Sequence, residues 1–383
     1  MIDSAIALLE RLVAFDTTSR YTNLPLLDWV ETLLTAHGFR IERLYDESGT
    51  KANLFATIGP EGVPGYVLSG HTDVVPVDGQ DWSTPPFTLT RKDGLLYGRG
   101  AADMKGFLAV CLAKVPAIAA ARLNRPIHLA FSYDEEVGCT GVRSLVADLR
   151  DRPIKPIACF VGEPTSMQVI VAHKAKYNFR ATVKGKPCHS SLAPQGVNAI
   201  DYAARLIVFL RELGLKVAEG PRDPLYDVPF TTVHTGLISG GTALNIVPEC
   251  CEVTFEFRSL PQADSESLVQ EIRRFACEAL EPEMKAIAPE TGIDIDLYNF
   301  APGLDTPVDA EVTQLAKRFA GRNDHAKVAY ATEACLFSEA EIPTVVVGPG
   351  SIEQAHKPDE FIAVSELEKA LMFVDRLIAH SSD

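Results

Sequence analysis

The sequence GYVLSGHTD at residues 65–73 places a short apolar run directly before polar residues, and this order decides the fold. The same order recurs in IHLAFSYDEE at residues 127–136 and in ACFVGEPT at residues 158–165. Short apolar runs bounded in this way predict buried strands. Helical periodicity lies between them, over residues 105–121 and near residues 141–148. Strands that alternate with helices predict an α/β fold, with a mostly parallel sheet and helices on both of its faces.

The pattern changes near Tyr177, where strands and helices follow a different order. We expect strands at 178–184, 231–238, 249–259 and 294–298, with helices at 198–213 and 265–280. This β-α-β-β-α-β order predicts a ferredoxin-like α+β domain with a four-stranded antiparallel sheet and two helices. The expected domains are a catalytic metal-binding domain at 1–177 and 299–383, and an inserted lid and dimerisation domain at 178–298.

Composition excludes some classes of protein. The chain has 383 residues, 46% of them hydrophobic, and a formal net charge of −15. This composition is typical of a soluble globular protein, and the negative charge argues against a nucleic-acid partner. No run of 18 apolar residues and no secretory signal is present, so we expect neither a membrane span nor export. The eight cysteines form no CxxC pair, which favours reduced thiols and a cytoplasmic location.

Imidazole and carboxylate side chains follow several of the expected strands. In a parallel sheet, sites form beyond the carboxyl ends of the strands, so residues from separate segments meet there. The candidates are His71, Asp73, Asp103, Glu135, Glu136, Glu163, His189 and His356. Such a set can hold two divalent metal ions and still provide a general base.

Several of these residues have ordinary structural alternatives when each is considered alone. His71 and Asp73 are two apart in an extended segment, so Asp73 can orient a metal-binding imidazole, but a His-x-Asp pair by itself is weak. Glu135 and Glu136 could form a solvated turn, and Glu163 could favour a helix N-terminus. The order of all the motifs is more informative than any one of them.

The motifs together resemble the dinuclear-zinc metallohydrolases that include aminoacylase, succinyl-diaminopimelate desuccinylase and glutamate carboxypeptidase. The resemblance runs nearly end to end, and it rests on GHTDVVPVDGQDWSTPPF, LYGRGAADMKGF, DEEVGCTG, VGEPT, KGKPCHSSLAPQGVNAI, LNIVPECCEVTFEFRSLP and GPGSIEQAHKPDEFI. It implies two bound divalent metal ions, with zinc expected and cobalt as the alternative. Asp103 would bridge both ions, His71 and Glu163 would complete one site, and Glu136 and His356 would complete the other. Glu135 would be the general base.

The resemblance also implies roles for residues of the inserted domain. His189 would stabilise the oxyanion of the tetrahedral intermediate, in its own subunit or in the partner of a homodimer formed through this domain. Arg258 would bind the substrate α-carboxylate, with Asn245 beside it. The alternatives are a loop histidine for His189 and a structural ion pair for Arg258. Cys188 and Ala175 stand where the family more often has smaller residues, which puts fine specificity in doubt.

The expected substrate is a small N-acyl amino acid. Within the family the motifs fit best the hydrolysis of N2-acetyl-L-ornithine to L-ornithine and acetate, a step of arginine biosynthesis. Glu333 could then bind the cationic side chain, although a helix-cap or surface role is equally open. Alternatives on the same scaffold are desuccinylation, N-acetylcitrulline deacetylation and broader aminoacylase action. A non-catalytic metal-binding protein is a distant alternative, and no G-x-S-x-G motif supports serine hydrolysis.

Overall fold

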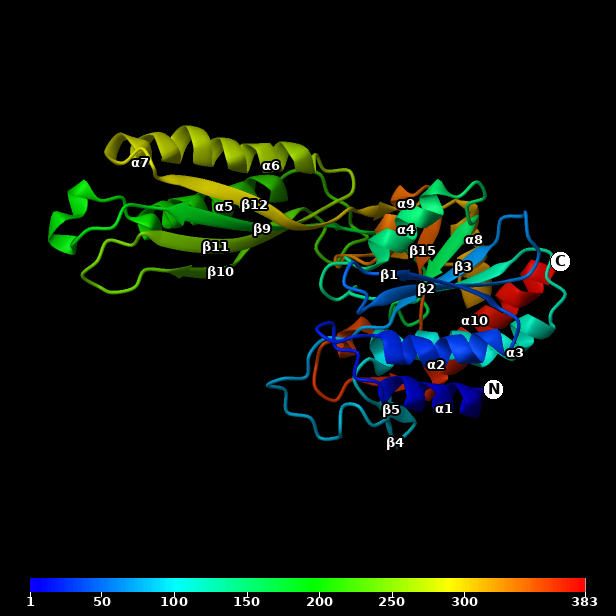
Figure 1. The fold of residues 1–383 in the computed structure, drawn as a ribbon. Helices are drawn as coiled ribbons and strands as arrows, with labels where there is room; N and C mark the ends of the chain where they lie inside the picture. The colour runs from blue at the N-terminus through cyan, green and yellow to red at the C-terminus, as the bar shows by residue number, and fades with distance from the viewer. Residues whose placement is uncertain (383) are drawn as a thin grey trace. The chain divides into compact units, whose positions relative to one another are not determined.

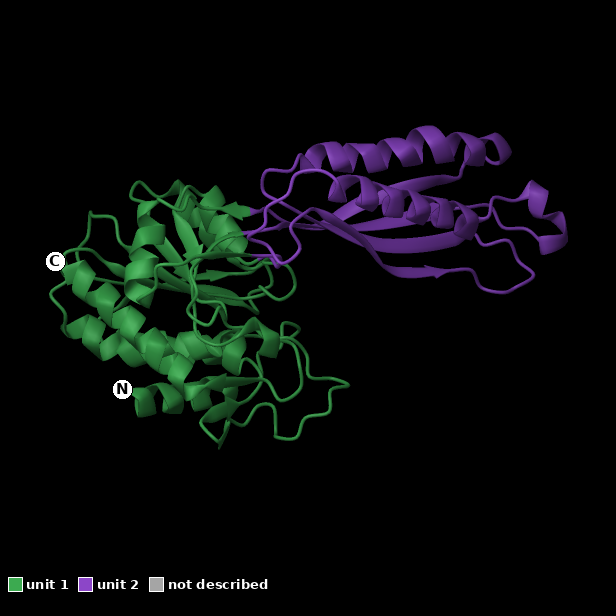
Figure 2. Ribbon diagram, turned by 180° about the vertical axis from the view of Figure 1, so that it is seen from behind, with its two compact units in different colours: residues 1–172, 304–327, 332–383 green, residues 173–303, 328–331 purple. Residues whose placement is uncertain are grey.

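The computed structural model describes residues 1–382, which form two compact units (Figure 2). Unit 1 comprises residues 1–172, 304–327 and 332–383, and unit 2 comprises residues 173–303 and 328–331. The bounds 178–298 for an inserted domain remain a prediction, and they lie inside unit 2.

A nine-stranded sheet forms the centre of unit 1. Its strands are β1 (Arg40–Tyr45), β2 (Ala52–Ile58), β3 (Tyr66–His71), β6 (Ile127–Ser132), β7 (Ala158–Val161), β8 (Ile170–His173), β13 (Leu304–Asp305), β14 (Ala326–Val328) and β15 (Thr344–Val346). The order is β1-β2-β6-β3-β7-β15-β8-β13, with β14 beside β8. The four central strands, β6, β3, β7 and β15, are mutually parallel. The expected strand at 158–161 matches β7, and the predicted α/β class is confirmed.

Helices cover both faces of this sheet (Figure 1). They are α1 (Ile2–Val13), α2 (Leu24–Thr35), α3 (Gly106–Ala120), α4 (Val142–Asp151), α8 (Glu311–Ala320), α9 (Ala334–Glu339) and α10 (Val364–Ser382). The buried faces of α1, α2, α3, α8 and α10 share one apolar core with the sheet. Helices α4 and α9 contact each other on the opposite face. Helix α3 is buried along nearly its whole length, since both α1 and α10 pack against it.

The parallel strands carry the chain to a common edge of the sheet. Strand β3 ends at His71, opposite Ser132 at the end of β6, and the backbone N–H of Gly162 after β7 donates to the carbonyl of Ser69. Because the carboxyl ends of parallel strands meet at one edge, the residues that follow these strands come together.

A separate three-stranded antiparallel sheet lies in unit 1. It comprises β4 (Thr90–Lys92), β5 (Leu95–Tyr97) and β16 (Phe361–Ala363). Strand β5 leads into a short π-helix, Ala101–Lys105, and then α3, while β16 follows the segment that carries His356. This sheet therefore joins two distant parts of the chain.

Unit 2 contains a four-stranded antiparallel sheet in the order β10-β11-β9-β12. Its elements are β9 (Ala175–Lys184), α5 (Ala199–Ala218), β10 (Thr232–Gly240), β11 (Cys250–Ser259), α6 (Ser265–Arg274), α7 (Glu281–Ile287) and β12 (Gly292–Ala301). Helices α5 and α6 bury apolar residues against one face of the sheet. The predicted ferredoxin-like arrangement is confirmed, with α7 and a π-helical turn at Phe275–Leu280 extending the second helix.

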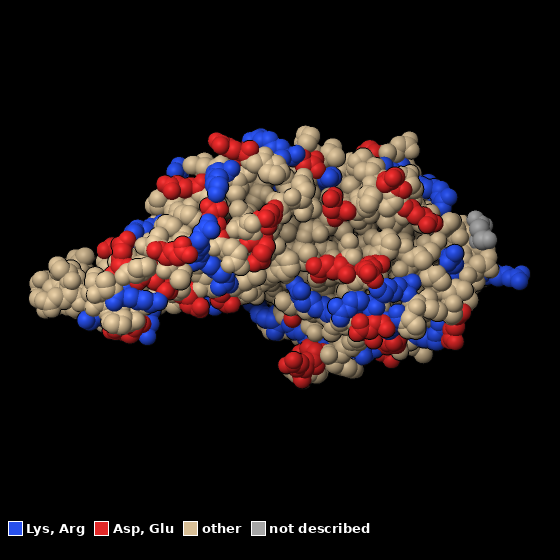
Figure 3. All heavy atoms as spheres, turned by 90° about the horizontal axis from the view of Figure 1, so that it is seen from above, with Lys and Arg blue, Asp and Glu red and all other residues tan. Residues whose placement is uncertain are grey.

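The surface is mixed in charge. On the face shown in Figure 3, acidic and basic side chains are interspersed. No helix within residues 1–382 is long and apolar enough to cross a membrane.

Candidate metal centre

The five predicted metal ligands lie in unit 1 on five separate segments. His71 ends β3, Glu163 follows β7, and Glu136 follows β6. Asp103 lies in the π-helical turn before α3, and His356 lies in the loop between a short 3-10 helix, Ile352–Gln354, and β16. The structure brings all five together, although they are spread over 286 positions of sequence from His71 to His356.

Asp103 lies at the centre of the cluster, where its two carboxylate oxygens face two different histidines. Its Oδ1 atom is 3.0 Å from Nε2 of His71, and its Oδ2 atom is 3.3 Å from Nε2 of His356. A carboxylate that presents one oxygen to each of two imidazoles has the geometry of a bridge between two ions.

Each histidine has a second carboxylate beside it. The Nε2 atom of His71 is 3.9 Å from Oε1 of Glu163, and Nε2 of His356 is 2.9 Å from Oε2 of Glu136. Two ligand groups therefore share Asp103: His71 with Glu163, and His356 with Glu136. The resemblance implies the same two groups, and their role as metal ligands remains a prediction.

The donor atoms are close enough to hold metal ions. One atom each from His71, Asp103 and Glu136, and likewise from His71, Glu135 and Glu163, lie within 4.8 Å of one another. A divalent ion with bonds of about 2.0–2.2 Å to nitrogen and oxygen can lie between such donors. Both groups contain His71, and the second contains Glu135. The residues therefore fit divalent ions, and their division into two sites remains a prediction.

Asp73 organises this cluster through both its backbone and its side chain. The Nδ1 atom of His71 is 2.9 Å from the backbone carbonyl oxygen of Asp73 and 3.5 Å from its carboxylate, so the carbonyl is the nearer partner. The Asp73 carboxylate accepts the backbone N–H groups of Glu135 and Glu136, at 3.1 and 3.3 Å. Asp73 therefore contacts His71 and also holds the turn that carries Glu135 and Glu136. The sequence did not predict the contacts with this turn. The hydroxyl of Ser19 also donates to Asp73, at 2.7 Å.

The buried charges shift the pKa values of the cluster in opposite directions. Burial would raise the pKa of Asp103, but hydrogen bonds with His356 and His71 outweigh burial and lower it below its usual range. Hydrogen bonds to Asp103 and Glu136 raise the pKa of His356 to about 10. Burial and the charge of Asp103 raise the pKa of Glu136 to about 7. Burial also raises the pKa of Glu163. The carboxylates of Asp103, Glu136 and Glu163 are therefore costly to ionise together, and dications remove that cost.

Glu135 differs from the ligands in its surroundings. Burial raises the pKa of Glu135 to about 8, with the neighbouring His71 opposing the shift and Glu136 adding to it. Its Oε1 atom accepts the thiol of Cys139 at 3.2 Å. A carboxyl group with a raised pKa beside a set of metal ligands has the properties of a general base.

The other predicted site residues His189, Asn245 and Arg258 belong to unit 2. The backbone N–H of Ser190 donates to the carbonyl of Asn245 at 2.9 Å, so His189 and Asn245 are held on neighbouring segments. The Nδ1 atom of His189 accepts the backbone N–H of Ser191 at 3.2 Å. An amide N–H can only donate, so the neutral ring carries its proton on Nε2. The exposed His189 side chain can therefore donate a hydrogen bond from Nε2.

Arg258 lies near the end of β11, where its partly buried guanidinium makes one ion pair. Its Nε atom is 3.1 Å from Oε1 of Glu256. Within the described residues, neither Nη atom has a hydrogen-bond partner, so this edge of the guanidinium can bind a carboxylate with two parallel bonds.

Glu333 is fully buried in unit 1 just before α9. Its Oε1 atom accepts the hydroxyl of Ser69 at 2.7 Å, and its Oε2 atom accepts that of Ser132 at 2.6 Å. It makes no side-chain cap on α9, so the helix-cap and surface alternatives are both wrong. Its substrate-binding role remains a prediction.

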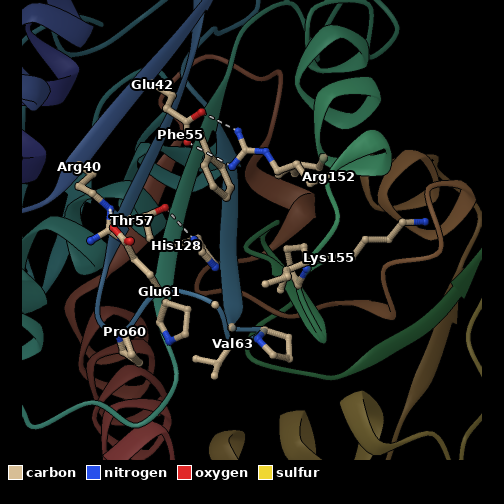
Figure 4. A pocket seen from close by; sticks show the side chains of 17 residues that line it. Arg40, Glu42, Phe55, Thr57, Pro60, Glu61, Val63, His128, Arg152 and Lys155 are labelled. Atoms are coloured by element: carbon tan, nitrogen blue, oxygen red, sulfur yellow. Dashed lines mark hydrogen bonds and ion pairs between the residues drawn. The ribbon is translucent and has the colours of Figure 1, made fainter.

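A pocket in unit 1 lies away from these residues (Figure 4). It is lined by His128, near the start of β6, and by Gly65 and Pro156, which precede β3 and β7. The pocket thus borders the amino ends of the parallel strands, whereas the ligand cluster lies at their carboxyl ends. Its cations are paired with acids, as Arg152 is with Glu42 at 2.7 Å.

Known proteins resemble this chain in sequence and in fold. The model of peptidase family M20/M25/M40 matches residues 67–380. The acetylornithine deacetylase of Yersinia pseudotuberculosis serotype O:1b (strain IP 31758) is 36% identical over 372 residues, covering 96% of this chain and 93% of that protein. The acetylornithine deacetylase of Proteus mirabilis (strain HI4320) is 38% identical over 354 residues, covering 92% and 88%. The M20 family metallo-carboxypeptidase Sso-CP2 from Sulfolobus solfataricus superposes with a TM-score of 0.78 at 19% identity, covering 99% of each chain.

The chain belongs to peptidase family M20/M25/M40. Its ligand cluster and its family make it a metal-dependent hydrolase.

Proposed function

We propose that this hydrolase removes the acetyl group from N2-acetyl-L-ornithine, giving L-ornithine and acetate. The observation that carries the proposal is the position of Asp103, which presents one oxygen to each of two histidines beside Glu135. That geometry supports amide hydrolysis at a two-metal site. The choice of substrate rests on relatives that are 36% and 38% identical over most of this chain.

The bound ions would polarise the amide carbonyl and make water acidic enough to act as a nucleophile near neutral pH. Glu135 takes a proton from the attacking water. It then delivers that proton to the nitrogen of the leaving amine as the C–N bond breaks. Burial raises the pKa of Glu135 in the metal-free chain. Beside bound ions, the same carboxylate can accept the proton of the attacking water and then release it to the amine. The Asp73 carboxylate holds the backbone of Glu135 during this exchange.

His189 is the proposed donor to the oxyanion that forms on the carbonyl oxygen. The tautomer fixed by Ser191 supports this role, because it leaves the proton on Nε2. Arg258 is the proposed ligand for the α-carboxylate of the substrate, and its unpaired Nη edge supports this assignment. Asn245, held beside the His189 segment, is proposed to assist in substrate binding.

Glu333 is proposed to favour the cationic side chain of ornithine through its buried negative charge. Changing Glu333 to Gln should then raise KM for N2-acetyl-L-ornithine much more than for N-acetylmethionine. An equal change for both substrates would leave Glu333 a structural residue that holds Ser69 and Ser132.

We propose zinc as the native metal, with cobalt as a functional substitute, because the ligand set of imidazoles and carboxylates suits both ions. We also propose a homodimer formed through unit 2. Strand β10 is an edge of its sheet, and Leu237 and Ile238 on it are 69% and 55% exposed. An exposed apolar edge strand is a surface on which a second copy can pair. Light scattering of the protein and of an Ile238→Lys variant tests this interface, since the variant should be monomeric. A cytoplasmic location remains a prediction from the cysteine content.

The substrate is tested by kcat/KM values for a panel of N-acyl amino acids. The panel contains N2-acetyl-L-ornithine, N-acetylcitrulline, N-acetylmethionine and succinyl-diaminopimelate. We expect the highest value for N2-acetyl-L-ornithine. A higher value for another member would retain the hydrolase chemistry and discard the proposed substrate.

A further inference from the structure

A chain of polar contacts connects the loop of Asp103 with the loop of His356. The contacts involve Glu360, Arg99 and Gln80, three residues to which the proposed reaction assigns no role. We call these three residues the ligand brace.

Glu360 holds the segment that leads to Asp103. Its buried carboxylate accepts three backbone N–H groups, those of Gly100 at 2.9 Å, Ala102 at 2.9 Å and Asp103 at 3.0 Å. Within this π-helical turn the backbone of Asp103 departs from helical geometry, with φ −120° and ψ 93°. A carboxylate that accepts successive N–H groups fixes such a backbone because each of the bonds is charge-assisted.

Arg99 and Gln80 extend the contacts to His356. Arg99 donates to Glu360 at 2.8 Å through Nη1 and to the side-chain carbonyl of Gln80 through Nη2. The Gln80 amide in turn donates to the backbone carbonyl of His356 at 3.0 Å. Arg99 and Glu360 are each 1% exposed, so water does not compete for this pair.

His356 depends on such support more than the other histidine does. His71 ends an inner strand, where it pairs with Ser132 of β6. His356 has a φ of 63°, lies outside any helix or strand, and has a side chain that is 55% exposed. The brace is therefore placed to fix the ligand that has the least support from secondary structure.

We infer that the ligand brace positions Asp103 and His356 for metal binding, so that Glu360 sets the affinity of both ions through Asp103, and Gln80 sets the affinity of the ion at His356. These are positioning residues, since they act through the ligands. Loss of partners that orient metal ligands typically weakens metal binding by about 10- to 100-fold. The inference rests on the proposed two-metal site.

The test is calorimetric titration of metal-free protein with Zn²⁺, performed on the unaltered chain, Glu360→Gln and Gln80→Met. We expect two binding steps for the unaltered chain, and both steps weakened by about 10- to 100-fold in Glu360→Gln, because Asp103 belongs to both proposed sites. Gln80→Met should weaken one step only, and by a smaller factor, because Gln80 bonds to the segment of His356. Excess Zn²⁺ should restore the turnover of both variants, which a merely misfolded protein would not show.

Leu149→Ala serves as the control, because Leu149 is buried in α4 and touches neither loop of the brace. It should lower Tm and leave both binding steps unchanged. Unchanged binding steps in both Glu360→Gln and Gln80→Met would overturn the inference. If Glu360→Gln does not fold, Gln80→Met decides alone, since Gln80 lies in a partly exposed loop. Fewer than two steps in the unaltered chain would instead overturn the two-metal proposal, and with it the inference.

Discussion

The carboxylate of Asp73 accepts the backbone N–H of Glu135 at 3.1 Å, which ties the proposed general base to the strand that carries a metal ligand. Asp73 is 2% exposed, and its other oxygen accepts from Glu136 and Ser19. The Asp73 carboxylate therefore fixes the turn that carries both Glu135, the proposed base, and Glu136, a proposed metal ligand.

Changing Asp73 to Asn should impair turnover without removing any proposed ligand. The Asn amide NH2 would replace one carboxylate oxygen, so a donor that now bonds to that oxygen would lose its acceptor. A buried donor without an acceptor lowers the free energy of unfolding by about 1–3 kcal/mol. We expect kcat to fall by roughly 10- to 100-fold, measured at saturating zinc. Asp151→Asn is a matched control, because the Asp151 side chain is 74% exposed and lies at the end of α4. Equal activities for the two variants would contradict the role of Asp73.

Variants of Glu135 and His356 should have different effects on turnover and on metal content. Glu135→Ala is expected to retain both metal ions and to lose roughly 100- to 10,000-fold in kcat, because proton transfer is lost. His356→Ala is expected to retain only one ion per chain after dialysis. Metal analysis beside kinetics measures both, and normal turnover by Glu135→Ala would show that another residue is the base.

Arg258 should distinguish substrates by their α-carboxylate. Arg258→Ala is expected to reduce kcat/KM for N2-acetyl-L-ornithine by roughly 30- to 1000-fold, since a bidentate charged contact is lost. N-acetylputrescine, which lacks the carboxylate, should be hydrolysed equally by the variant and the unaltered chain. Arg180→Ala, on the neighbouring strand β9, is the control, because Arg180 pairs with Glu252 on the surface. An equal fall in kcat/KM for both compounds would show that Arg258 has a structural role.

His128 should make the fold sensitive to acid. Burial, with the nearby cations Arg152 and Arg40, lowers the pKa of His128 to about 3. The unfolded chain binds a proton at this residue below about pH 6.5, whereas the folded chain does not until about pH 3. Stability from this group is therefore present above pH 6.5 and is lost as the pH falls towards 3.

The variant His128→Gln should lose less stability than the unaltered chain between pH 7.5 and pH 5. The expected difference is on the order of 1–2 kcal/mol, measured by urea unfolding. The control is His37→Gln, in the turn that follows α2. Identical pH profiles for His128→Gln and the unaltered chain would show that His128 does not contribute to acid sensitivity.

Much of the fold was predictable because its signals are local. The apolar run at residues 158–161 is strand β7, and the periodicity at 105–121 is α3 with the turn before it. Short strands such as β5 and β16 were missed, because three residues paired with a distant segment have no periodic pattern. Helix α10 was also missed, although the spacing of its buried residues, from Leu367 to Leu377, could have revealed it.

The clustering of the proposed ligands could be predicted from the sequence, whereas most of their supporting contacts could not. The proposed ligands follow apolar strands or glycine-rich motifs, so both their type and their place are visible in sequence. Glu360 appeared in the sequence only as one more acid near His356, since its bonds to residues 100–103 depend on the tertiary fold. The serine partners of Glu333 are hidden for the same reason, because Ser69 and Ser132 become its neighbours only when β3 and β6 pair.

The most direct test of a two-metal deacetylase is acetate release from N2-acetyl-L-ornithine while Zn²⁺ or Co²⁺ is returned to metal-free protein. We predict no turnover without metal and a maximum near two ions per chain, with Glu135→Ala inactive throughout. Full turnover by protein shown to be metal-free, or no acetate release with two ions bound, would contradict the proposal.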